Sequence, residues 1–242
     1  MTLHRDVLSI SITDNEELIL ASDCSGGIGR KSADMVQVDP EIVGYFCLRV
    51  AAMECLAVGA SLKAVQLMNF TSDSVWGKYS SGVKKGLIEL GLGAIPITGS
   101  SESNFLLKQS ALGVTCIGMR EKHSDETIHD DLSYALIGTP LVGDEVMAHL
   151  SSVAPLPLFM RCIHHSSIID LLPVGSKGVL AELSLLIGEP LSKGEVTSVH
   201  DVEKSSGPST SFIISYHKEA EKEVRDLTGS YFHSLHLYSH NK

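Results

Sequence analysis

The sequence has few aromatic residues, few basic residues and no long apolar run, and each shortage excludes a class of protein. Aromatic residues make up only 5% of the 242 residues while glycine reaches 21, a balance typical of an α/β protein with many tight connections. Lysine and arginine total 19 against 29 acidic residues, which gives a net charge of −10. Such a surface repels nucleic acid. It still allows a nucleotide to bind if Mg²⁺ lies between the carboxylates and the phosphates.

Disulfide frameworks, zinc sites and membrane spans are also not expected. The five cysteines lie mostly in apolar segments, and no C-x-x-C pattern occurs. The opening residues, MTLHRDVLSISITDNEE, contain no basic stretch followed by an apolar one. No apolar run reaches the roughly 18 residues that a membrane-spanning helix needs. We therefore expect a soluble, cytoplasmic protein with no membrane and no nucleic-acid partner.

Strand-like and helix-like segments alternate along the chain, which predicts an α/β or α+β fold. The clearest helix starts at Pro40, which suits the first helical position, with Asp39 as its cap and Gly59 at its end. The segment LFMRCIHHSSII is interpreted as strand-like. The adjacent His164 and His165 would then point to opposite faces, so they are not expected to share a metal ion.

A polar, charged segment at residues 120–131 interrupts this alternation and predicts a domain boundary. We expect a first domain at residues 1–120, a linker at 121–133 and a second domain at 134–242.

Three carboxylates have positions that suit a metal ion. Asp23 ends an apolar run just before a glycine-bearing loop, Asp6 precedes another strand, and Glu54 shares the apolar face of the predicted helix with Cys47. A carboxylate on an apolar face needs a partner. The three could converge on one Mg²⁺, which prefers oxygen ligands. The alternatives are that the aspartates are ordinary turn residues and that Glu54 reaches water from an edge position.

A second candidate phosphate-binding segment is PITGSSESNF. Gly99, Ser100 and Ser101 follow a predicted strand, so the backbone there can approach a ligand closely, and Glu102 and Asn104 add polar side chains. The alternative is a plain connection between two strands. Neither a P-loop nor a dinucleotide-binding glycine fingerprint is present.

The order of these motifs resembles the aminoimidazole ribonucleotide synthetase-like superfamily, which includes thiamine monophosphate kinase and selenophosphate synthetase. The matching segments are ASD, PEIVGY, VAAMECLAVGA and TGSSESNF in the first 120 residues, and more weakly LIGTPLVGDEVM and GVLAELSLL. The resemblance implies an α/β (α+β) protein. Its N-terminal mixed-sheet domain would bind ATP and Mg²⁺ and dimerise through its sheet, and its smaller C-terminal domain would be ferredoxin-like.

The resemblance also implies roles for particular residues. Asp6, Asp23 and Glu54 would be the metal ligands. Phosphates would be held by Asp23 and by the backbone of two segments, Gly26–Gly27 and Gly99–Ser101, with Asn104 nearby.

Two positions depart from the superfamily pattern. Ser100 stands where the superfamily has an acid, and Glu102 could substitute for that acid. The superfamily's D-V-S-D-G is matched by VGSKG, where both acids are missing. Lys177 in this segment would either contact a phosphate or cap a helix end.

The compact length and the TGSSESNF loop most resemble the α-ribazole kinase branch. We therefore expect an ATP- and Mg²⁺-dependent kinase, acting as a homodimer, that phosphorylates a nucleoside 5′-hydroxyl in cobalamin lower-ligand salvage. Glu102 or Asp170 could orient that hydroxyl. The alternatives are another kinase or an ATP-dependent cyclo-ligase of the same superfamily, or a degenerate nucleotide-binding regulatory protein.

Overall fold

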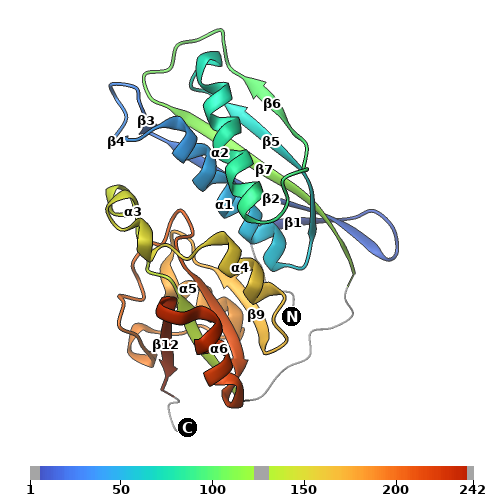
Figure 1. Ribbon diagram of the computed structural model, residues 1–242, viewed down its shortest axis with the longest axis vertical. Coiled ribbons are helices and arrows are strands. Elements are labelled where there is room, and N and C mark those ends of the chain that lie inside the picture. Colours follow the sequence, from blue (N-terminus) through green and yellow to red (C-terminus); the bar gives the residue numbers. More distant parts are fainter. Residues whose placement is uncertain (1–5, 123–130, 239–242) are drawn as a thin grey trace. The chain divides into compact units, whose positions relative to one another are not determined.

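The computed structural model describes residues 6–122 and 131–238, and these two stretches form separate units (Figure 1). We call them the N-terminal unit and the C-terminal unit. Each contains one five-stranded sheet with helices packed on it. Residues 123–130 of the predicted linker lie outside the described residues. No helix in the described part of the chain is long and apolar enough to cross a membrane.

The N-terminal unit is built on a mixed sheet with the strand order β1-β2-β7-β5-β6. Its strands are β1 (Val7–Ser11), β2 (Glu16–Gly26), β7 (Ala111–Glu121), β5 (Ser61–Asn69) and β6 (Ile97–Ser101). Strands β5 and β6 run parallel, and the other neighbours run antiparallel. Two short strands form a parallel pair of their own, β3 (Ile28–Gly29) and β4 (Val36–Gln37).

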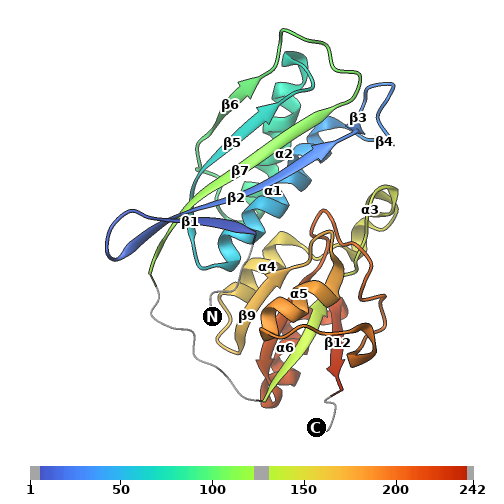
Figure 2. The ribbon, with the colours of Figure 1, turned by 180° about the vertical axis from the view of Figure 1, so that it is seen from behind.

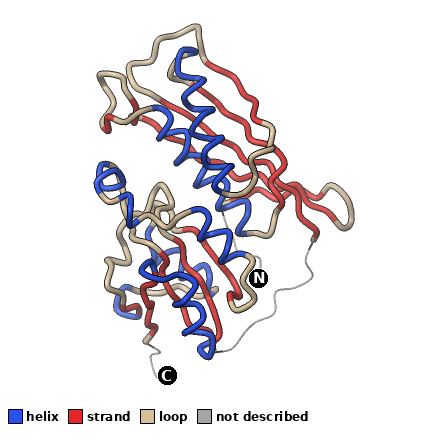
Figure 3. The backbone as a smooth tube through the Cα atoms, in the orientation of Figure 1, coloured by secondary structure: helices blue, strands red, loops and turns tan. Residues whose placement is uncertain are grey.

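Two helices cover one face of this sheet, as Figures 1 and 3 show. They are α1 (Pro40–Ala57) and α2 (Trp76–Glu89), the latter preceded by the short 3₁₀ helix η1 (Asp73–Val75). The prediction of α1 is confirmed in its cap and its start, because the Asp39 carboxylate accepts a hydrogen bond from the backbone N–H of Glu41 at 3.1 Å. Gly59 follows with a positive φ of 76°, so the chain turns there at little steric cost.

The opposite face of this sheet carries no helix of the N-terminal unit (Figure 2). In β2, Ile19 is fully buried, and its neighbours Leu18 and Leu20 point to the other face. They lie directly opposite Ile10 and Leu8 of β1, which are 41% and 59% exposed. An apolar strip therefore runs across β1 and β2 on the helix-free face.

Helices α1 and α2 approach each other through two glycines. A Cβ added at Gly82 would collide with the Glu41 carbonyl of α1, and one added at Gly44 would collide with the Tyr79 carbonyl of α2. Both glycines are buried. The backbones can meet this closely only because neither position has a side chain.

The C-terminal unit has an antiparallel sheet with the strand order β10-β12-β8-β11-β9. Its strands are β8 (Leu132–Ile137), β9 (Ile168–Pro173), β10 (Val196–Thr197), β11 (Phe212–His217) and β12 (Phe232–Leu237). Without β10 this is the order of a ferredoxin-like domain, in which two helix-connected strand pairs interlock. A helix and β10 are inserted between β9 and β11, where the simple motif has a direct connection.

Helices cover both faces of this second sheet. On one face, Val179 and Leu183 of α5 (Gly178–Ile187) share a buried cluster with Leu136 and Ile213. On the other face, Phe159 of α4 (Leu156–Ile163) stacks edge-on against Phe212, and Arg225 of α6 (Glu221–Thr228) lies over the ring of Phe232. The remaining short helices are α3 (Asp144–Ala148), η2 (Leu150–Ser152), η3 (Lys193–Glu195), η4 (Lys218–Ala220) and η5 (Gly229–Tyr231).

The strand-like interpretation of LFMRCIHHSSII is wrong, because most of its first half is helix α4. Leu158, Phe159 and Cys162 are buried at helical spacing, and Pro155 and Pro157 open the helix. His164 follows as the last capping residue, and His165 lies beyond the helix.

The glycine contact between α1 and α2 gives a stability prediction. Gly82→Ala should lower the free energy of unfolding by about 2 kcal/mol or more, because the new methyl group has to push the two helices apart. The matched control is Gly77→Ala on the same helix, where an added Cβ meets nothing within 4 Å. This control should change stability by less than about 1 kcal/mol. Urea unfolding measures both, and equal effects of the two substitutions would contradict the close contact.

Candidate functional site

Three strands of the N-terminal unit finish at the same end of the sheet. Strands β2 and β5 both run antiparallel to the central β7, and β6 runs parallel to β5. The last residues of the three strands, Gly26, Asn69 and Ser101, therefore lie at one edge. Ligands of open α/β sheets bind outside the carboxyl ends of the strands, so this edge is the candidate site.

Asp23 lies close to this edge on the helix-covered face. It follows Ile19 and Ala21 in the alternation of β2, both fully buried. The Cys47 side chain of α1 and the backbone N–H of Cys24 donate hydrogen bonds to its carboxylate. Burial raises the pKa of Asp23 to about 6, although these two hydrogen bonds act in the opposite direction. No lysine or arginine of the described residues is among its partners, so its charge is uncompensated there.

The three predicted metal ligands are not all brought together. Asp6 immediately precedes Val7, which pairs with Ala21, so Asp6 falls opposite Ser22 and, by the alternation of the strands, on the helix-free face rather than beside Asp23. Glu54 is two helical turns beyond Cys47 on α1, about 10 Å along the helix axis. Because α1 leads into the start of β5, Glu54 lies toward the opposite end of the sheet. The described residues contain no group of three His, Cys, Asp or Glu side chains able to hold a metal ion.

A second carboxylate, Asp34, holds the loop after β2. Its oxygens accept hydrogen bonds from the backbone N–H of Ser110 at 2.7 Å, the Ser110 hydroxyl at 2.7 Å and the backbone N–H of Lys31 at 2.8 Å. Asp34 is only 8% exposed. Burial alone would raise the pKa of Asp34, but the bonds from Ser110 and Lys31 outweigh burial and lower it. Asp34 is therefore a structural anchor.

Lys31 joins three loops at this edge. Its Nζ donates to the carbonyl of Thr71, just after β5, and to the carbonyl of Leu107, just before β7, both at 2.7 Å. Thr71 is further held by its hydroxyl, which lies 2.7 Å from the Tyr79 hydroxyl of α2. The ends of β2, β5 and β6 are thus fixed to one another by hydrogen bonds rather than by apolar packing.

The ends of β5 and β6 are joined by side chains. The Asn69 amide donates to the Ser101 hydroxyl at 2.8 Å and to the Ser72 carbonyl at 2.7 Å. One carboxylate oxygen of Glu102 accepts the backbone N–H of Asn104 at 2.6 Å. The predicted residues Ser101, Glu102 and Asn104 therefore lie at the same strand end as Asn69.

The expected loop conformation of Gly99, Ser100 and Ser101 is wrong, because all three lie inside β6, while their binding of a phosphate stays a prediction. They pair with Leu67, Met68 and Asn69 of β5. A Cβ at Gly99 would collide with the Leu67 carbonyl, so this glycine serves the contact between parallel strands.

The phosphate cradle at Gly26 and Gly27 stays a prediction, and the geometry is unfavourable only for Gly27. Gly26 lies opposite Ala111 in the ladder of β2 and β7, but the backbone groups of Ala111 bond to Phe70 and Thr71 instead. The Gly27 N–H donates to the Ser110 carbonyl at 2.8 Å, and the Gly27 carbonyl accepts from Met35 at 2.7 Å. A backbone N–H that is already bonded inside the protein is not available to a phosphate.

The two remaining candidates belong to the C-terminal unit. Asp170 lies half-buried in β9 opposite Ser215, and one of its carboxylate oxygens accepts the backbone N–H of Leu171 at 2.7 Å. Lys177 is exposed and occupies the N-cap position of α5, as one of its two expected roles has it, although its side chain makes no capping hydrogen bond.

The comparisons with known proteins come from structure alone. No protein-family model and no curated protein matches the chain. Among solved structures, AaThiL complexed with AMPPCP and TMP matches with a TM-score of 0.63 and 13% identity, over 97% of this chain and 85% of its own. Thiamine monophosphate kinase from Aquifex aeolicus gives a TM-score of 0.59 and 13% identity, over 88% and 83%.

PurL from T. maritima, complexed with AMPPCP, also matches, with a TM-score of 0.59 and 10% identity. The match covers 95% of this chain but only 42% of PurL. At such identities the similarities establish the fold alone. The chain has the aminoimidazole ribonucleotide synthetase-like fold. The expected fold class is thereby confirmed, while dimerisation and the α-ribazole kinase branch stay predictions.

The two aspartates beside this edge should respond to pH in opposite ways. The raised pKa of Asp23 means that its charge destabilises the folded state above pH 6, and that this cost disappears as the pH falls toward 4. Asp23→Asn should therefore gain about 1–2 kcal/mol over wild type at pH 7, allowing for its partial exposure, and nothing at pH 4. Urea unfolding at several pH values measures the difference.

Asp34→Asn is the control, because it should change the free energy of unfolding in the opposite direction. The lowered pKa of Asp34 stabilises the folded state above pH 4, and that contribution is lost as the pH falls further. This variant should lose about 2 kcal/mol at pH 7. If both asparagine variants lost stability at pH 7, the electrostatic distinction between the two carboxylates would be refuted.

Proposed function

We propose that this protein is an ATP- and Mg²⁺-dependent phosphotransferase acting on a hydroxyl of a small molecule. The observation that carries the proposal is the desolvated Asp23 carboxylate, which lies without a basic partner near the carboxyl ends of three strands. A strongly perturbed carboxylate in such a place is typical of functional sites. The fold adds support, because AaThiL and PurL have structures with the ATP analogue AMPPCP.

The donor set offers Mg²⁺ one protein carboxylate, Asp23, rather than three. Magnesium usually takes one or two carboxylates and completes its shell with substrate phosphates and water. Asp6 continues β1 on the helix-free face, and Glu54 lies toward the other end of the sheet, so neither would join Asp23. When bound, the ion would neutralise negative charge on the phosphates. The pKa of Asp23 would then fall toward its ordinary value.

The end of β6, at the same edge of the sheet but separated from β2 by β7 and β5, offers groups for orienting the acceptor. Ser101 accepts its hydrogen bond from Asn69, so its own proton can be donated to a ligand oxygen. Glu102 uses one carboxylate oxygen for Asn104, which leaves the other free to accept the proton of an acceptor hydroxyl. Positioning of this kind supplies most of the rate in phosphoryl transfer.

For the acceptor we propose α-ribazole, whose 5′-hydroxyl would be phosphorylated. This part of the proposal rests on the resemblance of the TGSSESNF segment.

A nucleotide-binding regulatory protein is the second candidate. It is favoured by one structural observation: the Gly27 N–H already donates to the Ser110 carbonyl. Such a protein would bind ATP without consuming it.

The catalytic proposal is tested by ATP consumption with Mg²⁺ and a panel of α-ribazole, thiamine monophosphate, selenide and plain nucleosides. Asp23→Ala should lower kcat by two orders of magnitude or more, since charge neutralisation at the phosphates would be lost. The matched control, Asp14→Ala in the exposed turn between β1 and β2, should keep full activity. ATP binding without turnover on any acceptor would favour the regulatory candidate, and full activity of Asp23→Ala would remove the metal site.

We also propose that the protein is a homodimer that pairs through the helix-free face of the N-terminal sheet. Ile10→Lys places a charge in the apolar strip of β1 and β2, so the variant should be monomeric while the wild type has twice the mass of one chain. Ile88→Lys on α2 is the control, because Ile88 is 68% exposed on the helix side. Light scattering coupled to size exclusion measures the masses. A monomeric wild type, or a dimer that survives Ile10→Lys, would refute this interface.

A further inference from the structure

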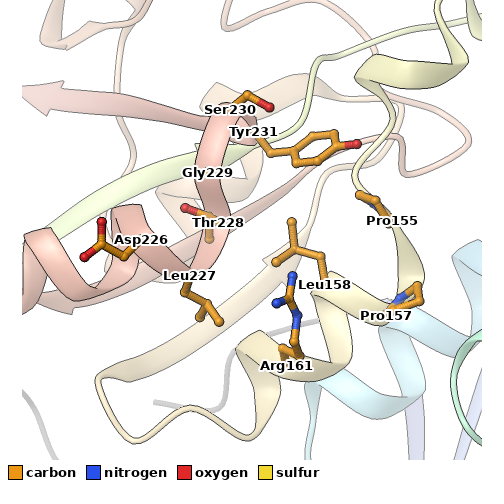
Figure 4. Close-up of a pocket in the computed structure, with 10 residues that line it drawn as sticks. All are labelled: Pro155, Pro157, Leu158, Arg161, Asp226, Leu227, Thr228, Gly229, Ser230 and Tyr231. Atoms are coloured by element: carbon orange, nitrogen blue, oxygen red, sulfur yellow. The ribbon is translucent and has the colours of Figure 1, made fainter.

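A groove crosses the C-terminal unit between α4 and the end of α6. It consists of two adjoining shallow hollows of about 340 and 390 Å³, both open to solvent, which share Arg161 and Leu227 as lining residues. The first continues toward η5 and the second toward the histidines that follow α4 (Figure 4 shows the first). All lining residues belong to the C-terminal unit, so the groove is separate from the candidate site described above.

The walls of the groove are mainly apolar. Leu158 and the two prolines at the start of α4 line one side of the first cavity, and Leu227 and Tyr231 line the other. Met160 adds an apolar side chain to the second cavity. These side chains offer an aromatic ring and branched aliphatic groups to an apolar or aromatic body.

The cation of the groove, Arg161, has no carboxylate partner. Among the described residues, none forms an ion pair with its guanidinium, although Asp226 also lines the first cavity. In Figure 4 the guanidinium lies beside Leu158, and the Asp226 carboxylate points away from it. Glu223, the other nearby acid, accepts the Ser167 hydroxyl at 2.6 Å and lies 3.7 Å from His165. Arg161 is therefore left with its charge facing the groove.

An uncompensated guanidinium against apolar walls selects a particular ligand chemistry. A planar guanidinium binds a carboxylate or a phosphate through two parallel hydrogen bonds. The cavity volumes fall at the small end of the range for small-molecule pockets, roughly 300–1,000 Å³. A polyanion would be repelled by the net charge of −10 of the whole chain. A compact anion interacts mainly with the guanidinium of Arg161.

We propose that this groove is a binding site for a small aromatic anion. Arg161 holds its carboxylate or phosphate, and the ring packs between Pro157, Leu227 and Tyr231. The proposal goes beyond the phosphotransferase function and does not depend on it, because no residue of the N-terminal unit takes part.

The test is an NMR titration of the full chain, without ATP or Mg²⁺, using phenylacetate, phenyl phosphate and the neutral phenylacetamide. At least one anion should shift backbone amides of α4, α6 and η5 and bind at least about tenfold more tightly than phenylacetamide, since a charged hydrogen bond is lost in the amide. Comparing phenylacetate with phenyl phosphate shows which anionic group the site prefers.

Arg161→Gln removes the charge from this exposed position and should weaken the preferred anion by about tenfold or more. The matched control is Lys222→Gln, an exposed cation of α6 that does not line the groove, which should leave the affinity unchanged. The proposal is overturned if neither anion shifts these amides, if phenylacetamide binds equally well, or if the two variants have the same affinity. Because no nucleotide is present, a failure here is distinct from a failure of the phosphotransferase proposal.

Discussion

The central position of β7 is the constraint on which the N-terminal unit depends. This strand pairs antiparallel with β2 along its whole length and with β5 on its other side. The carboxyl ends of β2, β5 and β6 are therefore forced to one edge of the sheet. Ser110, just before β7, is held by Asp34 of the loop after β2, and Leu107 is held by Lys31. Pairing in the sheet brings the loops together, and a few charged hydrogen bonds then fix them.

The C-terminal unit differs from the N-terminal unit because helices cover both faces of its sheet. Its apolar core is therefore divided into two layers. The layer under α5 is closed by Val179 and Leu183. The layer under α4 and α6 relies on aromatic contacts such as Phe159 with Phe212, and its outer surface carries the groove at Arg161. A short helix such as α4 buries one face only, which leaves its other face available to a ligand.

The sequence predicts helices and strands well where local rules suffice. Helix α1 follows from Asp39, Pro40 and a continuous apolar face, and the alternation of strands and helices predicts both sheets. Prediction from the sequence fails where contacts between residues far apart in the chain determine the conformation of a segment. The local sequence around Gly99 is typical of a loop, and only the pairing with β5 shows that this glycine belongs to a strand. Nothing in the local sequence shows that the Gly27 N–H is bonded to the Ser110 carbonyl. Helix α4 was missed because eight residues contain too few helical turns to show a clear period.

The candidate site shows the same limit for carboxylates. Asp23 and Asp34 are eleven residues apart, and both look like polar residues beside a glycine loop. Only the fold separates them: Asp34 receives three hydrogen bonds from Ser110 and Lys31, while Asp23 is buried against the Cys47 thiol with no basic partner among the described residues. A structural carboxylate is stabilised by its own protein. A carboxylate that is partly buried without a basic partner would be stabilised by a bound cation, and this is the physical argument behind the role proposed for Asp23 rather than for Asp34.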